Sequence, residues 1–192
     1  MITIEKRIVI DVMKFRRPIN LYLQKWLDEL KHCKNYMVNI VEGSYDICTA
    51  RRQSLKNFVN NFVPKGWDYL LQFDDDICPV PSSENILTYH EPLIYLGQAN
   101  QNKDGAHYGD DDFGCSASRI HKSLATRMDI ATSYDFKFNE DRTLVTDCEC
   151  HTFYNQAKKL GFKSRMVGVI GHEVRQIIVP TEDGIKEWKY IK

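Results

Sequence analysis

Residues 67–76 read Trp-Asp-Tyr-Leu-Leu-Gln-Phe-Asp-Asp-Asp, an apolar run of strand length that leads directly into three consecutive carboxylates. Carboxylates so close together repel one another, and they cost free energy wherever water cannot solvate all of them. At the end of a buried strand, Asp74, Asp75 and Asp76 therefore require a cation. Because Mg²⁺ and Mn²⁺ take oxygen ligands and keep coordination positions for substrate phosphates, the stretch indicates chemistry on a phosphate-bearing substrate.

Strand-like and helix-like runs alternate on the N-terminal side of this stretch. Buried strands are predicted at 7–13, 36–41 and 67–74, and amphipathic helices at 19–31 and 48–62. This alternation is typical of βαβ units, and it predicts an α/β domain with a mainly parallel central sheet flanked by helices.

The pattern is weaker after residue 79. The expected elements are a short helix at 83–90, a strand at 92–96, a polar loop at 98–112, a strand at 113–118, helices at 120–128 and 146–160, and a strand at 165–170. The last 20 residues are expected to form a tail or a hairpin packed on the domain.

Length and charge limit the possible classes. A chain of 192 residues suits a single domain over 1–192. Twenty-six basic and 26 acidic residues give a formal charge of zero, so a nucleic-acid partner is not favoured. No run of about 18 apolar residues occurs, which predicts no transmembrane segment and favours a cytoplasmic location.

The cysteines do not have the paired spacing of a structural zinc site, and they are predicted to be mostly reduced, buried thiols. They are Cys33, Cys48, Cys78, Cys115, Cys148 and Cys150. Cys148-Glu149-Cys150-His151 is poorly spaced for a metal and is interpreted as ordinary helix sequence. His151 has no partner at ligand spacing in the sequence.

Position in the fold supports a functional role for the three consecutive acids at 74–76, which we call the strand-end aspartates. In open α/β sheets, ligands bind beyond the carboxyl ends of the strands. A solvated acidic turn is the alternative. The second triplet, 110–112, follows a polar loop and is better interpreted as solvated.

The first half of the chain resembles the nucleotide-sugar half of GT-A fold glycosyltransferases of the family-2 type. The resemblance is carried by Val9 to Met13, by Asn-Ile-Val-Glu-Gly-Ser-Tyr-Asp at 39–46, by Ala-Arg-Arg at 50–52 and by residues 67–79. The resemblance continues weakly to Gly171-His172. Within the family, the chain is similar to compact members encoded by viruses of crenarchaeal hosts.

The resemblance implies a metal-dependent, hexosyltransferase-like enzyme. It divides the chain into a nucleotide-binding half (1–79), an acceptor and catalytic half (80–172) and a C-terminal tail (173–192). The implied substrates are a UDP- or GDP-sugar and a hydroxyl of a glycan or protein acceptor, and the implied cofactor is Mn²⁺ or Mg²⁺. The Asp-x-Asp motif of the family implies that Asp74 and Asp76 hold the metal, with His172 as a third ligand.

The same resemblance implies donor-binding residues. Arg51 and Arg52 open the second helix where the family has Ala-Arg-Asn, and the sequence leaves open which arginine meets the diphosphate. Asp75 is grouped with them. Glu42 and Met13 follow or end the first two strands, where the family contacts the base and ribose.

Two acids compete for the role of catalytic base near the start of the helix predicted at 146–160. A capping box between Thr146 and Glu149 would turn Glu149 back to the backbone and leave Asp147 in the first turn to face the site. Asp147 is therefore preferred, Glu149 is the runner-up, and a structural acid stabilised by the helix dipole is the alternative.

Other functions remain open at this point. No enzyme nucleophile is evident, which favours an inverting transfer. A nucleotidyltransferase or a phosphohydrolase could use the same metal site, and a catalytically silent module could retain a nucleotide-sugar pocket.

Overall fold

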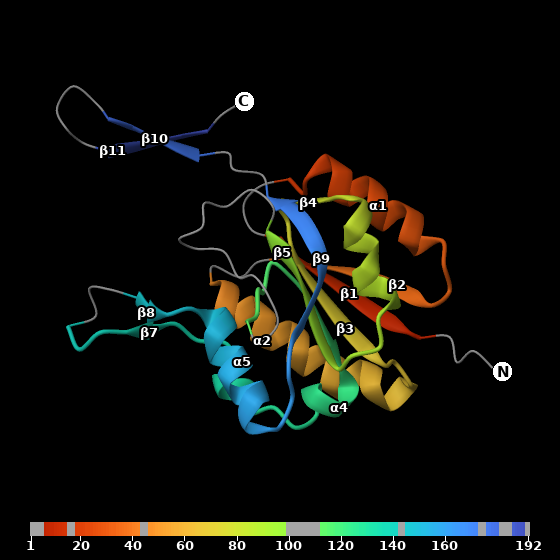
Figure 1. Ribbon diagram of the computed structural model, residues 1–192. Coiled ribbons are helices and arrows are strands. Elements are labelled where there is room, and N and C mark those ends of the chain that lie inside the picture. Colours follow the sequence, from red (N-terminus) through yellow and green to blue (C-terminus); the bar gives the residue numbers. More distant parts are fainter. Residues whose placement is uncertain are drawn as a thin grey trace.

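The structure is a computed structural model that describes residues 6–14, 18–42, 46–98, 112–141, 145–172, 176–180 and 186–190. A seven-stranded sheet forms the centre, and helices lie on both of its faces (Figure 1). The predicted α/β class is therefore confirmed.

The central sheet is mixed but mainly parallel. Its strands are, in spatial order, β2 (Tyr36–Val41), β1 (Ile8–Met13), β3 (Tyr69–Asp74), β6 (Ala117–His121), β5 (Leu93–Gln98), β9 (Arg165–His172) and β4 (Ile77–Pro79). The first three strands are parallel to one another, and β6 is antiparallel to its neighbours β3 and β5. Strand β9 is parallel to β5, and β4 is antiparallel to β9. Five of the seven strands thus run in one direction.

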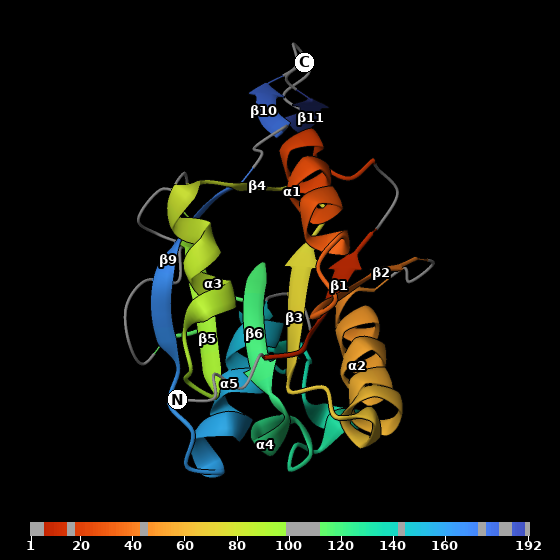
Figure 2. The ribbon, with the colours of Figure 1, turned by 90° about the vertical axis from the view of Figure 1, so that its right-hand side faces the viewer.

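The helices form two layers, each over its own apolar core (Figure 2). On one face, α1 (Leu21–Lys31) and α3 (Asn85–Thr88) bury residues such as Leu23 and Ile86. On the other face lie α2 (Ile47–Asn57), α4 (Lys122–Ala125) and α5 (Glu149–Lys159), which bury Leu55, Leu124 and Phe153. Burial of apolar side chains on both faces explains the near-continuous apolar strands.

The helix predicted at 48–62 is α-helical only as far as Asn57. A π-helical turn at Phe58–Phe62 and a 3₁₀ turn at Val63–Lys65 follow it. Pro64 cannot continue an α-helix because it has no N–H and its ring would meet the carbonyl four residues earlier. Gly66 then adopts φ 81°, a left-handed conformation that reverses the chain toward β3.

Two predictions for the middle of the chain were wrong in detail. The strand predicted at 113–118 is β6 at 117–121, and the helix predicted at 120–128 is reduced to α4. Ile120 pairs with Leu70 of β3 and Leu93 of β5, so its apolar side chain is buried in the sheet rather than on a helix.

Shorter elements complete the described fold. The helix predicted at 83–90 is a 3₁₀ turn (Pro81–Glu84) that continues into α3, and β7 (Lys137–Phe138) pairs with β8 (Val145–Asp147). The C-terminal segment contains a hairpin of β10 (Gln176–Pro180) and β11 (Lys186–Tyr190). The hairpin was one of the two predictions for this segment, and its packing on the domain stays a prediction. Most of the predicted loop at 98–112 lies outside the described residues. Within the described ranges, no helix has the length and apolarity needed to cross a membrane.

Candidate functional site

The carboxyl ends of the parallel strands bring several predicted site residues to one edge of the sheet. Met13 at the end of β1 is paired with both Val41 of β2 and Asp74 of β3. Glu42 follows Val41 directly. The sheet therefore places Met13 directly beside Asp74, with Glu42 one residue beyond the strand on the other side of Met13.

The chain after Asp74 crosses this edge and meets the far side of the sheet (Figure 2). β4 pairs with β9 so that Ile77 lies opposite His172. The three residues from Asp74 to Ile77 reach at most about 11 Å, whereas the four strand spacings between β3 and β4 would take about 19 Å in a flat sheet. The sheet therefore curls, and Asp76 adjoins the pairing partner of His172. The side chain of His172 lies outside the described part of the chain.

The strand-end aspartates are largely withdrawn from water. The exposed fraction is 0% for Asp75 and 6% for Asp76. The carbonyl of Asp75 accepts a hydrogen bond from the N–H of Asn20 at 2.8 Å, and Asn20 caps the N-terminus of α1. The triplet is thus built into the fold, and it is not the solvated acidic turn that was the alternative.

Arg51 forms a buried ion pair with the first of these acids. Its Nη2 lies 2.7 Å from Oδ1 of Asp74, and the arginine side chain is 1% exposed. Burial by itself disfavours the charged form, but Asp74 together with Cys115, Cys150 and Tyr134 offsets that penalty, and the pKa of Arg51 is raised above its ordinary value. Nε and Nη1 of Arg51 have no hydrogen-bond partner among the described residues. The guanidinium therefore places a positive charge in direct contact with the carboxylate of Asp74, on the buried side of that residue.

The second arginine points elsewhere. Arg52 donates from Nη1 to the carbonyl of Tyr134 at 2.7 Å, and its Nη2 lies 4.0 Å from Oδ2 of Asp46. It tethers α2 to the segment near Tyr134 and does not share the Arg51–Asp74 contact. The structure thus distinguishes two arginines that the sequence left equivalent.

A chain of buried hydrogen bonds runs beneath α2, and the sequence analysis did not find it. Asp11 accepts from Asn39 at 2.9 Å and from Ser54 at 2.6 Å. Gln72 donates to Ser54 at 3.0 Å and accepts from the hydroxyl of Tyr134 at 2.9 Å. Burial raises the pKa of Asp11, against the effect of these donors. The signal in the sequence was a lone polar residue inside each of two apolar strands.

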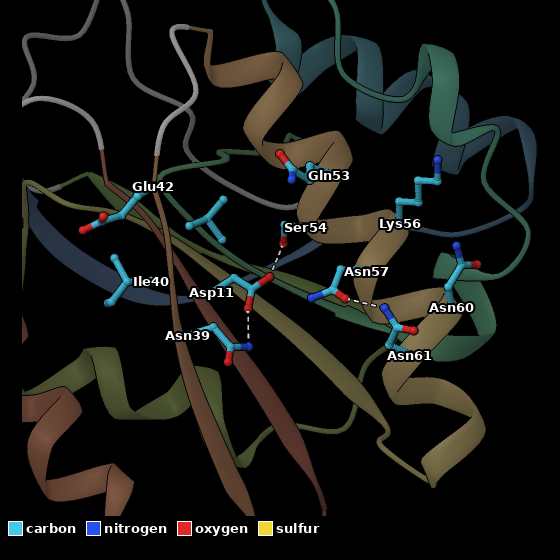
Figure 3. Close-up of a pocket in the computed structure, with 11 residues that line it drawn as sticks. Asp11, Asn39, Ile40, Glu42, Gln53, Ser54, Lys56, Asn57, Asn60 and Asn61 are labelled. Atoms are coloured by element: carbon cyan, nitrogen blue, oxygen red, sulfur yellow. Dashed lines mark hydrogen bonds between the residues drawn. The ribbon is translucent and has the colours of Figure 1, made fainter.

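One end of this chain opens into a polar pocket between β2 and α2 (Figure 3). The pocket has a volume of about 630 Å³, and Asp11, Asn39 and Glu42 line its sheet side. Carboxamides dominate its helix side, which contains Gln53, Asn57, Asn60 and Asn61. Glu42 is paired with Lys14 at 2.6 Å. A pocket with so many hydrogen-bonding groups suits a polar ligand better than an apolar one.

The helical argument for preferring Asp147 as a base was wrong. Asp147 ends β8, the cap of α5 is Cys148, and no side-chain hydrogen bond caps the helix, so the predicted capping box with Thr146 is not formed. Sheet pairing with Lys137 holds Asp147 outside the helix. Its Oδ2 lies 3.0 Å from Nζ of Lys137 and its Oδ1 3.0 Å from Nδ1 of His151. His151 therefore does have a partner, contrary to the sequence analysis.

Glu149 begins α5 and lies beside two buried cysteine thiols. One ligand atom each of Glu149, Cys115 and Cys150 lie within 4.8 Å of one another, and Cys150 Sγ is 3.7 Å from Oε1 of Glu149. Burial raises the pKa of the Cys115 thiol, which also interacts electrostatically with Arg51, Glu149 and Asp74.

The cysteines, all within the described ranges, are thiols without disulfides, as predicted. Burial is less uniform than predicted. Cys48, Cys115 and Cys150 are buried, whereas Cys33 is exposed.

The sheet and its two helical layers define the class of the fold, which is a Rossmann-like α/β domain. A similar structure is the crystal structure of A197 from STIV, at a TM-score of 0.57 and 13% sequence identity over 97% of this chain and 95% of that one. At that identity the likeness shows a shared fold alone.

A further solved structure is that of a glycosyltransferase involved in the glycosylation of the major capsid of PBCV-1. It has a TM-score of 0.40 and 12% identity over 62% of each chain, which is too low a similarity to carry an argument. No protein-family model matches the chain, and no curated protein matches its sequence.

Proposed function

We propose that this protein is a metal-dependent glycosyltransferase of the GT-A type, which moves a sugar from a nucleoside-diphosphate sugar to an acceptor hydroxyl. The observation that carries the proposal is the curled carboxyl edge, where Asp74 is paired with the buried Arg51 and where the chain carries Asp76 to β9. An edge with several buried acids and one buried cation suits a metal diphosphate.

The residues present fit Mn²⁺ or Mg²⁺. Asp74 and Asp76 would supply the carboxylate oxygens that these hard ions prefer, and His172 a nitrogen ligand. When bound, the ion would neutralise charge on the departing diphosphate. Arg51 would hold Asp74 in place and offset its charge. The arginine would therefore contact the metal ligand Asp74 and would not bind the phosphates.

The nucleoside end of the donor would lie toward β1 and β2. Met13 is paired with Asp74 on this edge, Glu42 follows the residue that pairs with Met13 on its other side, and Glu42 lines the polar pocket. Asp75 is buried, and its carbonyl accepts the N–H of Asn20, so its role would be to fix the turn between Asp74 and Asp76. Arg52 would hold α2, which lines the polar pocket, by its hydrogen bond to the carbonyl of Tyr134, and it would not bind phosphate itself.

Glu149 is the better supported base. A base accepts the proton of the attacking hydroxyl, and it must therefore stand near the sugar, on the metal side of the site. Glu149 lies beside the buried thiols of Cys115 and Cys150, whereas Asp147 is engaged by Lys137 and His151. A single base without an enzyme nucleophile corresponds to inversion at the sugar carbon.

Donor hydrolysis tests the proposal. The full chain is incubated with Mn²⁺ and a panel of UDP- and GDP-sugars, and release of the nucleoside diphosphate is measured. We expect metal-dependent release that is lost in Asp76→Asn and retained in Asp28→Asn, an exposed acid of α1.

Other products would contradict sugar transfer. Release of a sugar 1-phosphate with the nucleoside monophosphate transferred to the acceptor would indicate nucleotidyl transfer. Release of a sugar 1-phosphate together with free nucleoside monophosphate would indicate a phosphohydrolase. Metal-dependent binding of the donor with no turnover would indicate a silent nucleotide-sugar module.

A further inference from the structure

A second group of potential metal ligands lies where β8 meets α5. Asp147, Cys148 and His151 each offer one ligand atom, and these atoms lie within 4.8 Å of one another. We call these three residues the His151 cluster. All three are half-buried, so an ion could reach them from solvent and still be shielded in part. A tetrahedral zinc ion, with bonds of about 2.0–2.3 Å, places its ligand atoms roughly 3.3–3.7 Å apart. The cluster therefore needs only a small adjustment to enclose an ion.

The two nitrogens of the His151 ring face different acids. Nδ1 is 3.0 Å from Oδ1 of Asp147, within the cluster, and Nε2 is 3.4 Å from Oδ1 of Asp112. Metal-binding histidines usually keep the second ring nitrogen against a carboxylate, which fixes the tautomer and the ring orientation. The Asp112 contact is independent of the cluster and has this arrangement.

Asp112 is itself held in place. Its Oδ1 accepts the N–H of Phe113 at 2.7 Å, and its carbonyl accepts the hydroxyl of Ser164. Phe113 is fully buried and stacks on Phe153 of α5. The carboxylate of Asp112, beside His151, is therefore anchored to the core of the domain. This differs from the solvated loop predicted for the triplet 110–112, of which residues 110 and 111 lie outside the described residues.

The charges around the cluster also balance. The carboxylate of Asp147, a thiolate at Cys148, a neutral imidazole and a divalent ion sum to zero. Lys137, whose Nζ is 3.0 Å from Oδ2 of Asp147, offsets the charge of Asp112. An ion at this place would thus not leave a net buried charge, which is the usual cost of such a site.

We propose that Asp147, Cys148 and His151 bind a transition-metal ion of the zinc type, with Asp112 as the carboxylate that orients His151. A set of one sulfur, one nitrogen and one oxygen donor favours Zn²⁺ over Mg²⁺ and Mn²⁺, which prefer oxygen ligands. Water completes the coordination. The ion ties β8 and the start of α5 to the segment that enters β6.

This site goes beyond the proposed function. It uses other residues and another class of ion than the strand-end aspartates, and its occupancy does not require a nucleotide. The two proposals can therefore fail separately. The test is carried out without nucleotide, so loss of sugar-donor turnover has no bearing on it.

Cobalt titration of the full chain tests the proposal, because Co²⁺ accepts the same ligands as Zn²⁺ and its bond to a thiolate absorbs in the near ultraviolet. We expect a saturable sulfur-to-cobalt band that Zn²⁺ displaces. Cys148→Ser should abolish the band. His151→Ala should weaken zinc affinity by roughly 100-fold and Asp112→Asn by about 10- to 100-fold, as measured by competition with a chromophoric chelator.

Matched controls come from the end of α1, where His32 and Cys33 form an exposed pair of the same residue types. Cys33→Ser and His32→Ala should leave the band and the affinity unchanged. The proposal is overturned if no sulfur band appears, or if the band persists in Cys148→Ser with folding intact by circular dichroism. It is also overturned if Cys150→Ser alone removes the band, since the ion would then lie in the buried Cys115–Glu149–Cys150 group.

Discussion

The strand-end aspartates and the His151 cluster both contain carboxylates, but the two groups differ in burial and in their neighbours. The aspartates follow a central strand, are mostly buried, and have the charge of Arg51 behind them. The His151 cluster stands at a peripheral hairpin, is half-buried, and combines oxygen, sulfur and nitrogen donors. Donor type and burial therefore separate the site that we propose for a hard ion with a diphosphate from the site that we propose for a softer ion. Each prediction below probes one side of this comparison.

The largest effect is expected where the two regions compete for the catalytic role. Glu149→Gln should lower the rate of sugar-donor turnover by about 10²–10⁴, the usual contribution of a general base, and Asp147→Asn should lower it by much less. The measurement is the steady-state rate at saturating donor and Mn²⁺. The reverse order of the two variants would return the base to Asp147 and remove it from the metal cluster.

The buried ion pair should matter most for stability. Arg51→Met leaves Asp74 without its cation, and removal of one partner of a buried pair costs about 3–5 kcal/mol. Urea unfolding monitored by circular dichroism measures the free energy of unfolding. Arg52→Met, the adjacent and partly exposed arginine, is the control and should cost about 1 kcal/mol, the value of an ordinary hydrogen bond. Equal losses in the free energy of unfolding would mean that the Arg51–Asp74 ion pair contributes no more to stability than the hydrogen bond of Arg52.

The buried carboxyl at the polar pocket should make stability depend on pH. Burial raises the pKa of Asp11 in the folded state above its unfolded value. The folded state therefore holds this proton more tightly, and the associated stability is present below the unfolded pKa and is lost as pH rises through the folded pKa.

Comparison with Asp11→Asn tests this dependence. The free energy of unfolding of the original chain, relative to that of the variant, should fall as pH rises across that window. A difference that stays constant or rises with pH would show that the hydrogen bonds from Ser54 and Asn39 outweigh burial.

The smallest effect is expected at the rim of the His151 cluster. Lys137→Met removes an ion pair whose lysine is 56% exposed, and such pairs contribute less than about 1 kcal/mol to folding. The thermal midpoint without metal should hardly change. The gain in thermal midpoint on adding Zn²⁺ should persist, because Lys137 supports Asp147 without binding the ion. Loss of that gain would place Lys137 among the essential groups.

Short-range patterns in the sequence predicted much of the framework. The strands β1, β2 and β3 follow from short, nearly continuous apolar runs, and the amphipathic helices α1 and α2 follow from burial with a period of 3.6 residues. The acids were placed by their position directly after the apolar run of β3. These features depend on neighbours along the chain. The Asp11 and Gln72 interruptions were visible in the same way, but their meaning depended on a partner in α2.

The tertiary structure decided which of these residues meet. The Arg51–Asp74 pair, the pairing of Ile77 with His172 and the contact of His151 with Asp112 join residues 23, 95 and 39 positions apart, respectively. Local propensity cannot specify such contacts, because each depends on strand order, on the curl of the sheet and on the point where α5 begins. The sequence by itself determined an α/β domain with acids at a strand end. Only the packing of distant segments decided which acid has a buried cation behind it and which acid stands beside a histidine.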